Sequence, residues 1–214
     1  VNDGYPILSW QDGADEILYF FSGGIGTSDV PYQITTTDDL IELSNISTVW
    51  DKYFIQTADI SFNSDETAVD WDGDGNLEHG VSEDDSYGFS PIGNSTTKFT
   101  GSFDGQNYTI TNLFISRASS SNIGLFGFLS GATITNINLV GIDFTGNEIV
   151  GGLVGQDEGS TEISACTISS GSNTIDGVAY VGGFIGYSNS SGNISDCHFS
   201  GTISAGNLSD LSSA

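Results

Sequence analysis

The clearest chemical signal in this sequence is a nine-residue acidic stretch, Asp-Trp-Asp-Gly-Asp-Gly-Asn-Leu-Glu, which begins at Asp70. Carboxylates at the first, third and fifth positions, with glycine at the sixth, are typical of the front of an EF-hand-type calcium loop, where alternating side chains converge on one cation. We therefore expect a structural Ca²⁺ ion held by Asp70, Asp72 and Asp74 through carboxylates, Asn76 through its backbone carbonyl, and Glu78 directly or through water.

The second half of this loop departs from the EF-hand pattern. Its twelfth position is Val81 rather than a bidentate glutamate, so that ligand is either missing or supplied by Glu83, Asp84 or Asp85. No helices are expected to flank the loop, which favours a structural site over a sensor that opens on binding. The alternative is a solvated acidic loop without metal, because so acidic a chain contains some carboxylate clusters by composition alone.

Catalytic chemistry finds less support in the residue pattern. A calcium-dependent polysaccharide lyase needs a basic group near the abstracted proton, and the only Lys and Arg residues are Lys52, Lys98 and Arg117, none of which belongs to a recognisable motif. A glycosidase needs two carboxylates at a set separation, and the 28 acidic residues do not single out a pair. We predict that the chain is not an enzyme, with a carbohydrate-binding or polysaccharide-processing protein as the alternative.

The two cysteines, Cys166 and Cys197, occupy matching positions of a repeated phrase. Stacked positions in a parallel coil lie about 4.8 Å apart, a separation that a disulfide accepts. A bridge and a ladder of two free, buried thiols therefore both remain open. A zinc site with His198 is disfavoured, because strand alternation turns His198 away from the cysteine column.

The charge balance excludes several classes of partner. Three basic residues against 28 acidic ones give a net charge of -25, so the chain lacks the Lys and Arg clusters that bind nucleic acid or anionic membranes. No apolar run is long enough for a membrane span, and the first residues lack the features of a signal peptide. Because there is also no methionine, we expect a mature or excised segment of an extracellular, secreted or cell-surface protein.

A glycine-bracketed apolar word recurs three times, as Gly-Leu-Phe-Gly from Gly124, Gly-Leu-Val-Gly from Gly152 and Gly-Phe-Ile-Gly from Gly183. A period of about 30 residues is typical of a solenoid in which each repeat forms one coil. Between the words lie short β-prone segments separated by Gly, Ser and Asn, without sustained helical periodicity. The pattern predicts an all-β fold, a single-stranded parallel β-helix.

A second recurring phrase predicts which side chains face inward. Its first apolar position aligns Ile110, Ile134, Ile163 and Ile194, with a first interval shorter than the two that follow. The positions three and five residues further on are also mainly apolar: Leu113 and Ile115, Ile137 and Leu139, Cys166 and Ile168, Cys197 and Phe199. The position two residues on holds Asn112, Asn136, Ala165 and Asp196. We expect bends there, because Asn and Asp tolerate left-handed backbone.

The N-terminal half differs from these repeats. Residues 32–35 are a predicted strand, and Thr36 or Thr37 can cap a short helix with Asp38 and Asp39 in its first turn. Such a helix would close one end of the solenoid. Further strands are expected at 52–62, 89–93 and 99–105, with an acidic insertion at 63–86.

Taken together, these words resemble the GLUG-repeat family of bacterial and archaeal surface proteins, named for its Gly-Leu-variable-Gly motif. The resemblance rests on Gly-Thr-Ser-Asp-Val-Pro-Tyr-Gln-Ile at 26–34, Phe-Thr-Gly-Ser-Phe-Asp-Gly at 99–105, Thr-Ile-Thr-Asn-Leu at 109–113 and the three glycine words, and it covers most of residues 22–206. It implies a right-handed parallel β-helix in large secreted adhesins and surface proteins, without catalysis in the repeats.

The resemblance also gives a domain plan. Residues 1–21 are expected to be the tail of a preceding repeat block or an N-terminal extension, 22–105 a cap with the first coils and the acidic insertion, and 106–214 GLUG-type coils. We expect a structural or adhesive module, as a surface stalk, adhesin or filament subunit stabilised by Ca²⁺. The expected partners are tandem repeats or other copies through the coil ends, glycans, or other cell-surface proteins.

Overall fold

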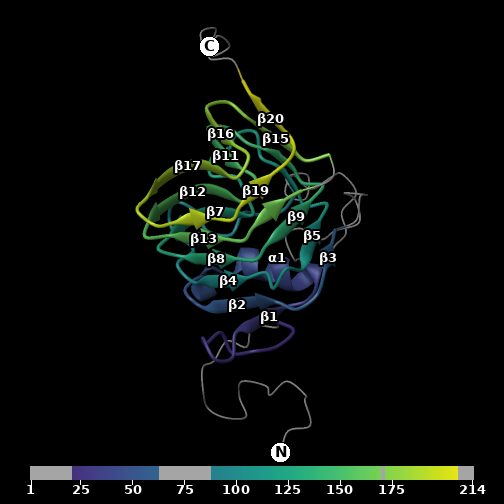
Figure 1. Ribbon diagram of the computed structural model, residues 1–214, viewed down its shortest axis with the longest axis vertical. Helices are drawn as coiled ribbons and strands as arrows, with labels where there is room; N and C mark the ends of the chain where they lie inside the picture. The colour runs from purple at the N-terminus through teal and green to yellow at the C-terminus, as the bar shows by residue number, and fades with distance from the viewer. Residues whose placement is uncertain (1–20, 63–87, 170–171, 207–214) are drawn as a thin grey trace, which may run out of the picture.

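The protein is a parallel β-solenoid of about three turns, with the coils stacked from the N-terminal to the C-terminal end (Figure 1). The structure, a computed structural model, describes residues 21–62, 88–169 and 172–206. Every pairing between two of its named strands is parallel. The predicted all-β, parallel β-helical fold is confirmed.

Each face of the solenoid is a ladder of strands from successive coils. The longest ladder contains β1 (Tyr32–Ile34), β2 (Tyr53–Gln56), β4 (Ser102–Asp104), β8 (Thr133–Thr135), β13 (Glu162–Ser164) and β18 (Ile194–Ser195). The next contains β3 (Ile60–Ser61), β5 (Thr109–Thr111), β9 (Asn138–Val140), β14 (Thr167–Ile168) and β19 (His198–Phe199). A third contains β6 (Phe114–Ser116), β10 (Asp143–Thr145), β15 (Thr174–Gly177) and β20 (Thr202–Ala205). The remaining strands are β7 (Phe126–Ser130), β12 (Val154–Gly159) and β17 (Ile185–Ser190), and β11 (Ile149–Gly151) with β16 (Tyr180–Gly182).

Inward-facing apolar side chains stack in register and form the core. Three columns include the following stacked residues: Phe103, Ile134, Ile163 and Ile194; Ile110, Leu139, Ile168 and Phe199; and Ile115, Phe144, Ile175 and Ile203. Below the last coil, every one of these residues is at most 1% exposed. Burial of one such side chain contributes about 1.5 to 3 kcal/mol, so the stack of coils is itself the source of stability.

The expected alignment of Ile110 with Ile134 is wrong. Ile110 pairs in register with Leu139, whereas Ile134 lies over Phe103. The step from Ile110 to Ile134 is too short for one coil, and the observed column from Ile110 instead advances by about 30 residues per coil. The Thr-Ile-Thr sequences of β5 and β8 therefore belong to different faces. Ile115, which was expected to align with Leu139, accordingly stacks on Phe144.

The expected bends are present. Asn112, Asn136, Ala165 and Asp196 have φ values of 58°, 54°, 53° and 54°, the left-handed region that Asn and Asp tolerate better than other residues with a side chain. Each bend separates two short strands and turns the chain from one face of the solenoid to the next.

The glycine words form tightly stacked corners with buried centres. Leu125, Phe126, Leu153 and Val154, at the centres of the first two words, are inaccessible to solvent. A Cβ atom on Gly152 would lie 2.5 Å from the carbonyl oxygen of the glycine above it in the next coil. Close approach between coils, rather than a positive φ, therefore requires glycine here.

The helix α1 (Thr37–Asn45) begins at the predicted cap. Thr36 Oγ1 accepts a hydrogen bond from the backbone N–H of Asp39 at 3.1 Å, and Asp39 Oδ2 accepts one from the backbone N–H of Thr36 at 2.9 Å, which completes a capping box. The buried Asp39 carboxylate also accepts hydrogen bonds from the backbone N–H groups of Ser22 and Thr35, each at 2.8 Å. Asp39 therefore ties the helix to the segment that precedes it.

The N-terminal end of the core is closed, as expected. The apolar side of α1 buries Leu40 and Leu43 completely, and Trp50 Nε1, just beyond the 3-10 helix η1 (Ser47–Val49), donates a 2.7 Å hydrogen bond to the carbonyl oxygen of Leu43. In front of β1, Gly23 forms an antiparallel bridge to Gln33. The outermost strand of this end is thus partly covered.

Other expected strands are shorter than the sequence indicates. Residues 52–62 form β2 and β3 with a break between them, where Gln56 Nε2 donates a 2.8 Å hydrogen bond to the carbonyl oxygen of Ala58. Within 89–93 only Ile92 forms a strand-like bridge, and 99–105 contains β4. The acidic insertion at 63–86 and residues 1–20 lie outside the described residues.

Candidate functional site

The predicted calcium ligands, Asp70, Asp72, Asp74, Asn76 and Glu78, all lie outside the described residues. Within 21–62, 88–169 and 172–206, no group of three or more His, Cys, Asp or Glu side chains is arranged to hold a metal ion. The calcium site therefore stays a prediction from the sequence.

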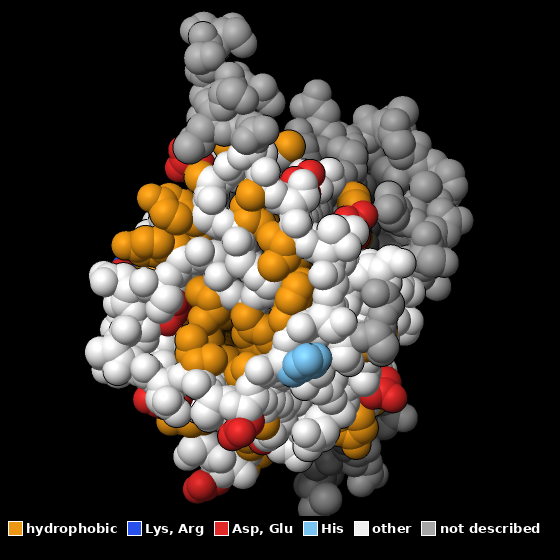
Figure 2. Space-filling model, turned by 45° about the horizontal axis from the view of Figure 1, so that its top comes forward, with side chains coloured by type: hydrophobic (Ala, Val, Ile, Leu, Met, Phe, Trp, Pro, Cys, Tyr) orange, Lys and Arg blue, Asp and Glu red, His pale blue; other side chains and the backbone are white. Residues whose placement is uncertain are grey.

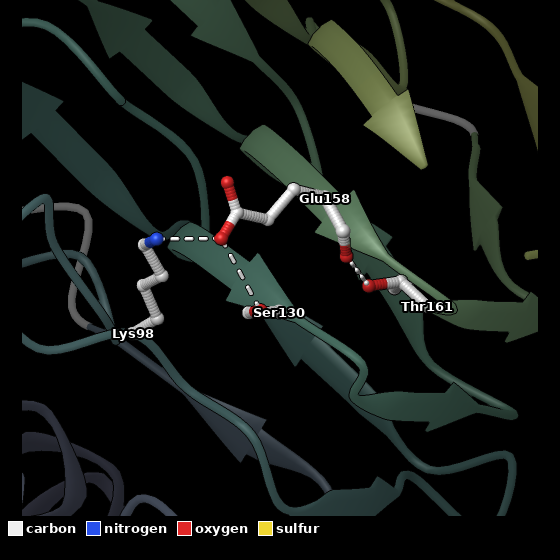
Figure 3. A network of polar contacts seen from close by, with 4 residues as sticks. All are labelled: Lys98, Ser130, Glu158 and Thr161. Atoms are coloured by element: carbon white, nitrogen blue, oxygen red, sulfur yellow. Dashed lines mark hydrogen bonds and ion pairs between the residues drawn. The ribbon is translucent and has the colours of Figure 1, made fainter. Parts of the chain in front are cut away.

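One polar cluster in the described part of the chain joins separate coils by linking Lys98 to Glu158 (Figure 3). Lys98 Nζ lies 2.5 Å from Glu158 Oε1, and the same oxygen accepts a 3.4 Å hydrogen bond from Ser130 Oγ. The backbone carbonyl of Glu158 accepts a 2.9 Å hydrogen bond from Thr161 Oγ1. The Lys98 ammonium also lies 4.8 Å from the centre of the Phe128 ring, within the range of a cation–π contact.

The stacking of coils explains why these distant residues meet. Phe99, next to Lys98, forms a bridge with Leu129 of β7, and β7 pairs with β12 so that Ser130 lies beside Glu158. The hydrogen bond from Lys98 is the main cause that lowers the pKa of Glu158. Because the two charges pair with each other, Lys98 and Glu158, with Ser130 between them, connect three successive coils. We call this contact the Lys98–Glu158 clamp. Sequence reasoning misses this clamp, because the two residues are 60 positions apart.

The two cysteines stack as expected and are both free thiols. Cys166 Sγ lies 3.2 Å from the carbonyl oxygen of Ser164, and Cys197 Sγ lies 3.2 Å from that of Ser195. Burial, followed by smaller effects that include the neighbouring Cys197 thiol, raises the pKa of Cys166 to about 12. His198 is exposed, as the alternation of the strand predicts.

Asp157 is a buried charged residue that the sequence pattern does not reveal. It is 1% exposed, and neither carboxylate oxygen has a hydrogen-bond partner among the described residues. Asp157 lies on β12, in register with Leu129 of β7 in the coil below and with Ser188 of β17 in the coil above. An inward-facing carboxylate in an apolar position is costly to stability.

Arg117, one of the basic residues considered for catalysis, lies beside a surface hollow of about 180 Å³ that is lined mainly by Ser and Asn side chains. Its guanidinium donates hydrogen bonds to the carbonyl oxygens of Gly88 at 3.2 Å and Phe89 at 3.4 Å. Arg117 therefore anchors the chain where the described solenoid resumes at Gly88. Lys52, another of these residues, lies 3.1 Å from Asp51 at the surface.

Two aromatic side chains are exposed near the C-terminal end of the solenoid. Tyr180 and Tyr187 are 55% and 39% exposed, and their ring centres lie 5.5 Å apart in an edge-to-face arrangement. Exposed aromatic rings are suited to stacking on sugars or to packing against another protein. No helix in the described part of the chain is both long and apolar enough to cross a membrane.

Fold and surface together define a repetitive β-solenoid whose polar clusters tie coils to one another. Comparison with known families then adds the particular repeat: residues 177–204 match the family model described as the GLUG motif. This match confirms, for residues 177–204, the resemblance to GLUG-repeat proteins stated from the sequence.

Two relatives align with much of this chain. One, from Haloquadratum walsbyi, is named Halomucin and is 33% identical over 183 residues, which are 85% of this chain and 2% of the relative. The other, from Evansella cellulosilytica, is provisionally named a Gly-rich membrane protein and is 28% identical over 144 residues, which are 65% of this chain and 15% of the relative. The chain therefore spans only a small part of the length of these curated relatives.

A solved structure from Bacteroides ovatus, provisionally described as an immunoglobulin A1 protease, is also similar. The match covers 86% of this chain and 70% of that one, at 15% sequence identity and a TM-score of 0.38.

Proposed function

We propose that this chain is a non-enzymatic structural or adhesive module, a rigid β-helical segment of a surface stalk, adhesin or filament. The observation that carries the proposal is the interior of the solenoid, in which the column residues named above are at most 1% exposed below the last coil. Such an interior leaves the outer faces and the ends of the solenoid for contacts, which is how repeat proteins work as extended scaffolds.

An extracellular or secreted location fits the same proposal. The net charge of -25 keeps the module soluble and repels anionic polymers. One relative is named for the membrane and another is named Halomucin. The proposed partners are tandem repeats or further copies at the coil ends, glycans, or other cell-surface proteins.

Calcium is the second part of the proposal. Ca²⁺ bound by Asp70, Asp72, Asp74, Asn76 and Glu78 would offset the repulsion among these acidic groups and stabilise the fold by mass action. Calorimetry should show one Ca²⁺ bound per chain, and the double variant Asp72→Asn/Asp74→Asn should lose this binding. Asp38→Asn, in the exposed first turn of α1, is the control that removes a similar charge elsewhere. Absence of Ca²⁺ binding by the unaltered chain at millimolar concentration would contradict the proposal.

A carbohydrate-binding or polysaccharide-processing role is the alternative, and the exposed Tyr180–Tyr187 pair is the observation in its favour. A glycan array and a polysaccharide turnover assay, both with Ca²⁺ present, separate the two. A structural stalk or filament subunit gives no turnover and no binding to a defined glycan. Loss of polymer length in the turnover assay would overturn the non-enzymatic role. Binding without turnover, abolished by Tyr180→Ala and Tyr187→Ala, would assign a glycan-binding adhesin.

A further inference from the structure

The described part of the chain presents several Asn-X-Ser/Thr triplets at its surface. In such a triplet the side-chain amide of asparagine is a possible attachment point for a saccharide. Triplets of this kind occur by composition in a chain so rich in Ser, Thr and Asn, so their number carries no argument, whereas their placement does. Within the described residues they begin at Asn45, Asn94, Asn107, Asn189 and Asn193.

Exposure separates the asparagines of these triplets from the others. Every described asparagine that begins a triplet is exposed. The described asparagines outside triplets are all half-buried or buried: Asn112, Asn122, Asn136, Asn138, Asn147 and Asn173. A saccharide is bulky and polar and fits only where the side chain reaches solvent. The triplets therefore lie at the positions that could carry one.

Several asparagines outside triplets use their side-chain nitrogen to join coils. Asn136 Nδ2 donates a 2.8 Å hydrogen bond to Asp104 Oδ1 in the coil below. Asn173 Nδ2 donates a 2.8 Å hydrogen bond to the carbonyl oxygen of Ser200 in the coil above. A saccharide on either nitrogen would break a contact between coils, so these positions are unsuited to modification.

The side chain of Asn94 is held in a geometry that suits attachment. Asn94 Oδ1 accepts hydrogen bonds from the backbone N–H groups of Thr96 and Thr97, each at 2.9 Å. Asn94 Nδ2 has no hydrogen-bond partner among the residues that the structure describes. Attachment of a sugar to Nδ2 keeps the amide carbonyl, so both hydrogen bonds of the turn would remain after modification.

Asn107 presents a second free amide at the turn between β4 and β5. Its φ is 63°, a conformation that asparagine tolerates well. The backbone N–H donates a 3.0 Å hydrogen bond to the carbonyl oxygen of Asn136, and the backbone carbonyl accepts a 2.8 Å hydrogen bond from Asn138 Nδ2. The neighbouring coil thus fixes the backbone of Asn107, while its exposed side-chain amide contacts no other polar group in the described part of the chain.

The outer surface of the coils is suited to a saccharide lying along it. In Figure 2 uncharged polar side chains and backbone, drawn in white, cover much of the visible surface outside the apolar area. Hydroxyl and amide groups supply donors and acceptors for sugar hydroxyls. Modification at exposed turns would also leave the buried columns of the core untouched.

We propose that Asn94 and Asn107 are N-glycosylation sites, modified by transfer of an oligosaccharide from a lipid-phosphate-linked donor. In this transfer the bond between the anomeric carbon of the sugar and the phosphate oxygen breaks, and a bond from that carbon to the asparagine Nδ2 forms. The oxygen leaves with the bonding electrons as the lipid phosphate, the amide nitrogen loses one proton, and no oxidant or reductant is needed. This inference rests on the extracellular location proposed above, to which it adds a modification and its chemical class.

The first test is peptide mass spectrometry of the protein recovered from the cells that make it. Fragmentation by electron transfer leaves the saccharide on its residue and so identifies the site. Asn94 and Asn107 should carry a saccharide, and the half-buried Asn138, which begins no triplet, should carry none. Unmodified Asn94 and Asn107 in every peptide would overturn the proposal, as would saccharides attached only to Ser or Thr.

The second test removes one triplet without removing its asparagine. Thr96→Ala, made in the same cells, keeps Asn94 and the backbone N–H that Asn94 binds, and it should abolish the saccharide on Asn94. Thr97→Ala is the matched control: this exposed threonine supplies the other N–H of the turn but lies outside the triplet, so modification should be unchanged. Circular dichroism checks that both variants are folded.

A saccharide that persists on Asn94 in Thr96→Ala, or that is lost equally from both threonine variants, would contradict modification through the triplet. In each variant Asn107 should stay modified, which shows that the protein has met the transferase.

The outcomes separate this inference from the proposed function. A chain at the cell surface that carries no saccharide would overturn the inference and leave the structural role intact. A glycosylated chain that degrades a polysaccharide would do the reverse. A chain found only inside the cell would overturn both the extracellular location and the glycosylation.

Discussion

Asp157 lies directly over Leu129 in the next coil, and both side chains point into the core of the solenoid. The two are register partners on β12 and β7, 1% and 0% exposed respectively. One column position thus changes from an aliphatic side chain to a carboxylate without a hydrogen-bond partner among the described residues. The buried carboxylate at this column position is a weak point of the coil stack.

Replacement of Asp157 by the residue found below it should therefore stabilise the protein. Asp157→Leu removes an unpaired buried carboxylate and adds apolar burial, so we expect the free energy of unfolding to rise by about 2 kcal/mol. Urea denaturation measures the change. Asp157→Asn, which removes the charge and keeps the polar group, is the control and should gain less. A loss of stability in Asp157→Leu would show that the carboxylate has an essential partner.

Ala165 offers a second stabilising change. Its φ of 53° is strained for a residue with a Cβ and no compensating side-chain hydrogen bond. We expect Ala165→Gly to raise the free energy of unfolding by about 1 kcal/mol. Ala179→Gly, at an exposed position outside the left-handed region, should instead be neutral or destabilising. Equal effects at the two positions would exclude backbone strain as the cause.

The cysteine column predicts unequal thiol reactivity. Because burial raises the pKa of Cys166 from its usual 9.0 to about 12, a thiol reagent at about pH 8 should modify the half-buried Cys197 in the native protein and Cys166 only after denaturation. The unfolded chain ionises this thiol first as the pH rises from 9.0 toward 12, so the stability that Cys166 contributes should fall over that interval. Cys166→Val, which removes the thiol, should flatten the decline. Two unreactive thiols in the denatured, unreduced protein would reveal a disulfide instead.

The Lys98–Glu158 clamp predicts a pH-dependent difference between variants. The pKa of Glu158 is lowered mainly by its hydrogen bond with Lys98, so the stabilisation is present above the usual carboxyl pKa and is lost as the pH falls through the lowered value. Lys98→Met should lower the melting temperature at about pH 7, and the difference from the unaltered protein should shrink as the pH falls below the usual carboxyl pKa of 4.5. Lys52→Met is the control, since Lys52 contacts its sequence neighbour Asp51 and bridges no coils.

A melting temperature lowered equally by the two lysine substitutions would contradict the clamp. It would show that each lysine acts through the net charge of the chain rather than through a contact between coils.

Much of the coil structure follows from local sequence, but its register does not. The spacing of Ile134, Ile163 and Ile194 predicts one true column, because an inward apolar residue recurs once per coil. The pattern misplaces Ile110 since Thr-Ile-Thr occurs on two faces of the solenoid, and a three-residue strand carries too little information to identify its face. Only the requirement that stacked residues be separated by about one coil of chain shows that Ile110 and Ile134 belong to different faces.

The helix cap could be predicted because all its determinants are local: Thr36 and Asp39 are three residues apart. The clamp could not, because Lys98 and Glu158 meet only after two coils have stacked. Asp157 also resists prediction: alternation counted from the buried Val154 assigns it to the outer surface, whereas Asp157 is buried in the observed strand. The calcium ligands from Asp70 to Glu78 stay a prediction that the described residues do not test.

The central feature of this fold is the set of in-register columns of buried apolar side chains, such as Phe103, Ile134 and Ile163. Urea denaturation of two matched variants tests its role in stability most directly. Ile134→Ala, in the middle of the column, should lower the free energy of unfolding by about 3 kcal/mol. Ile25→Ala, at a position that is 65% exposed, should change it little. Equal effects of the two substitutions would contradict the coil stack as the source of stability.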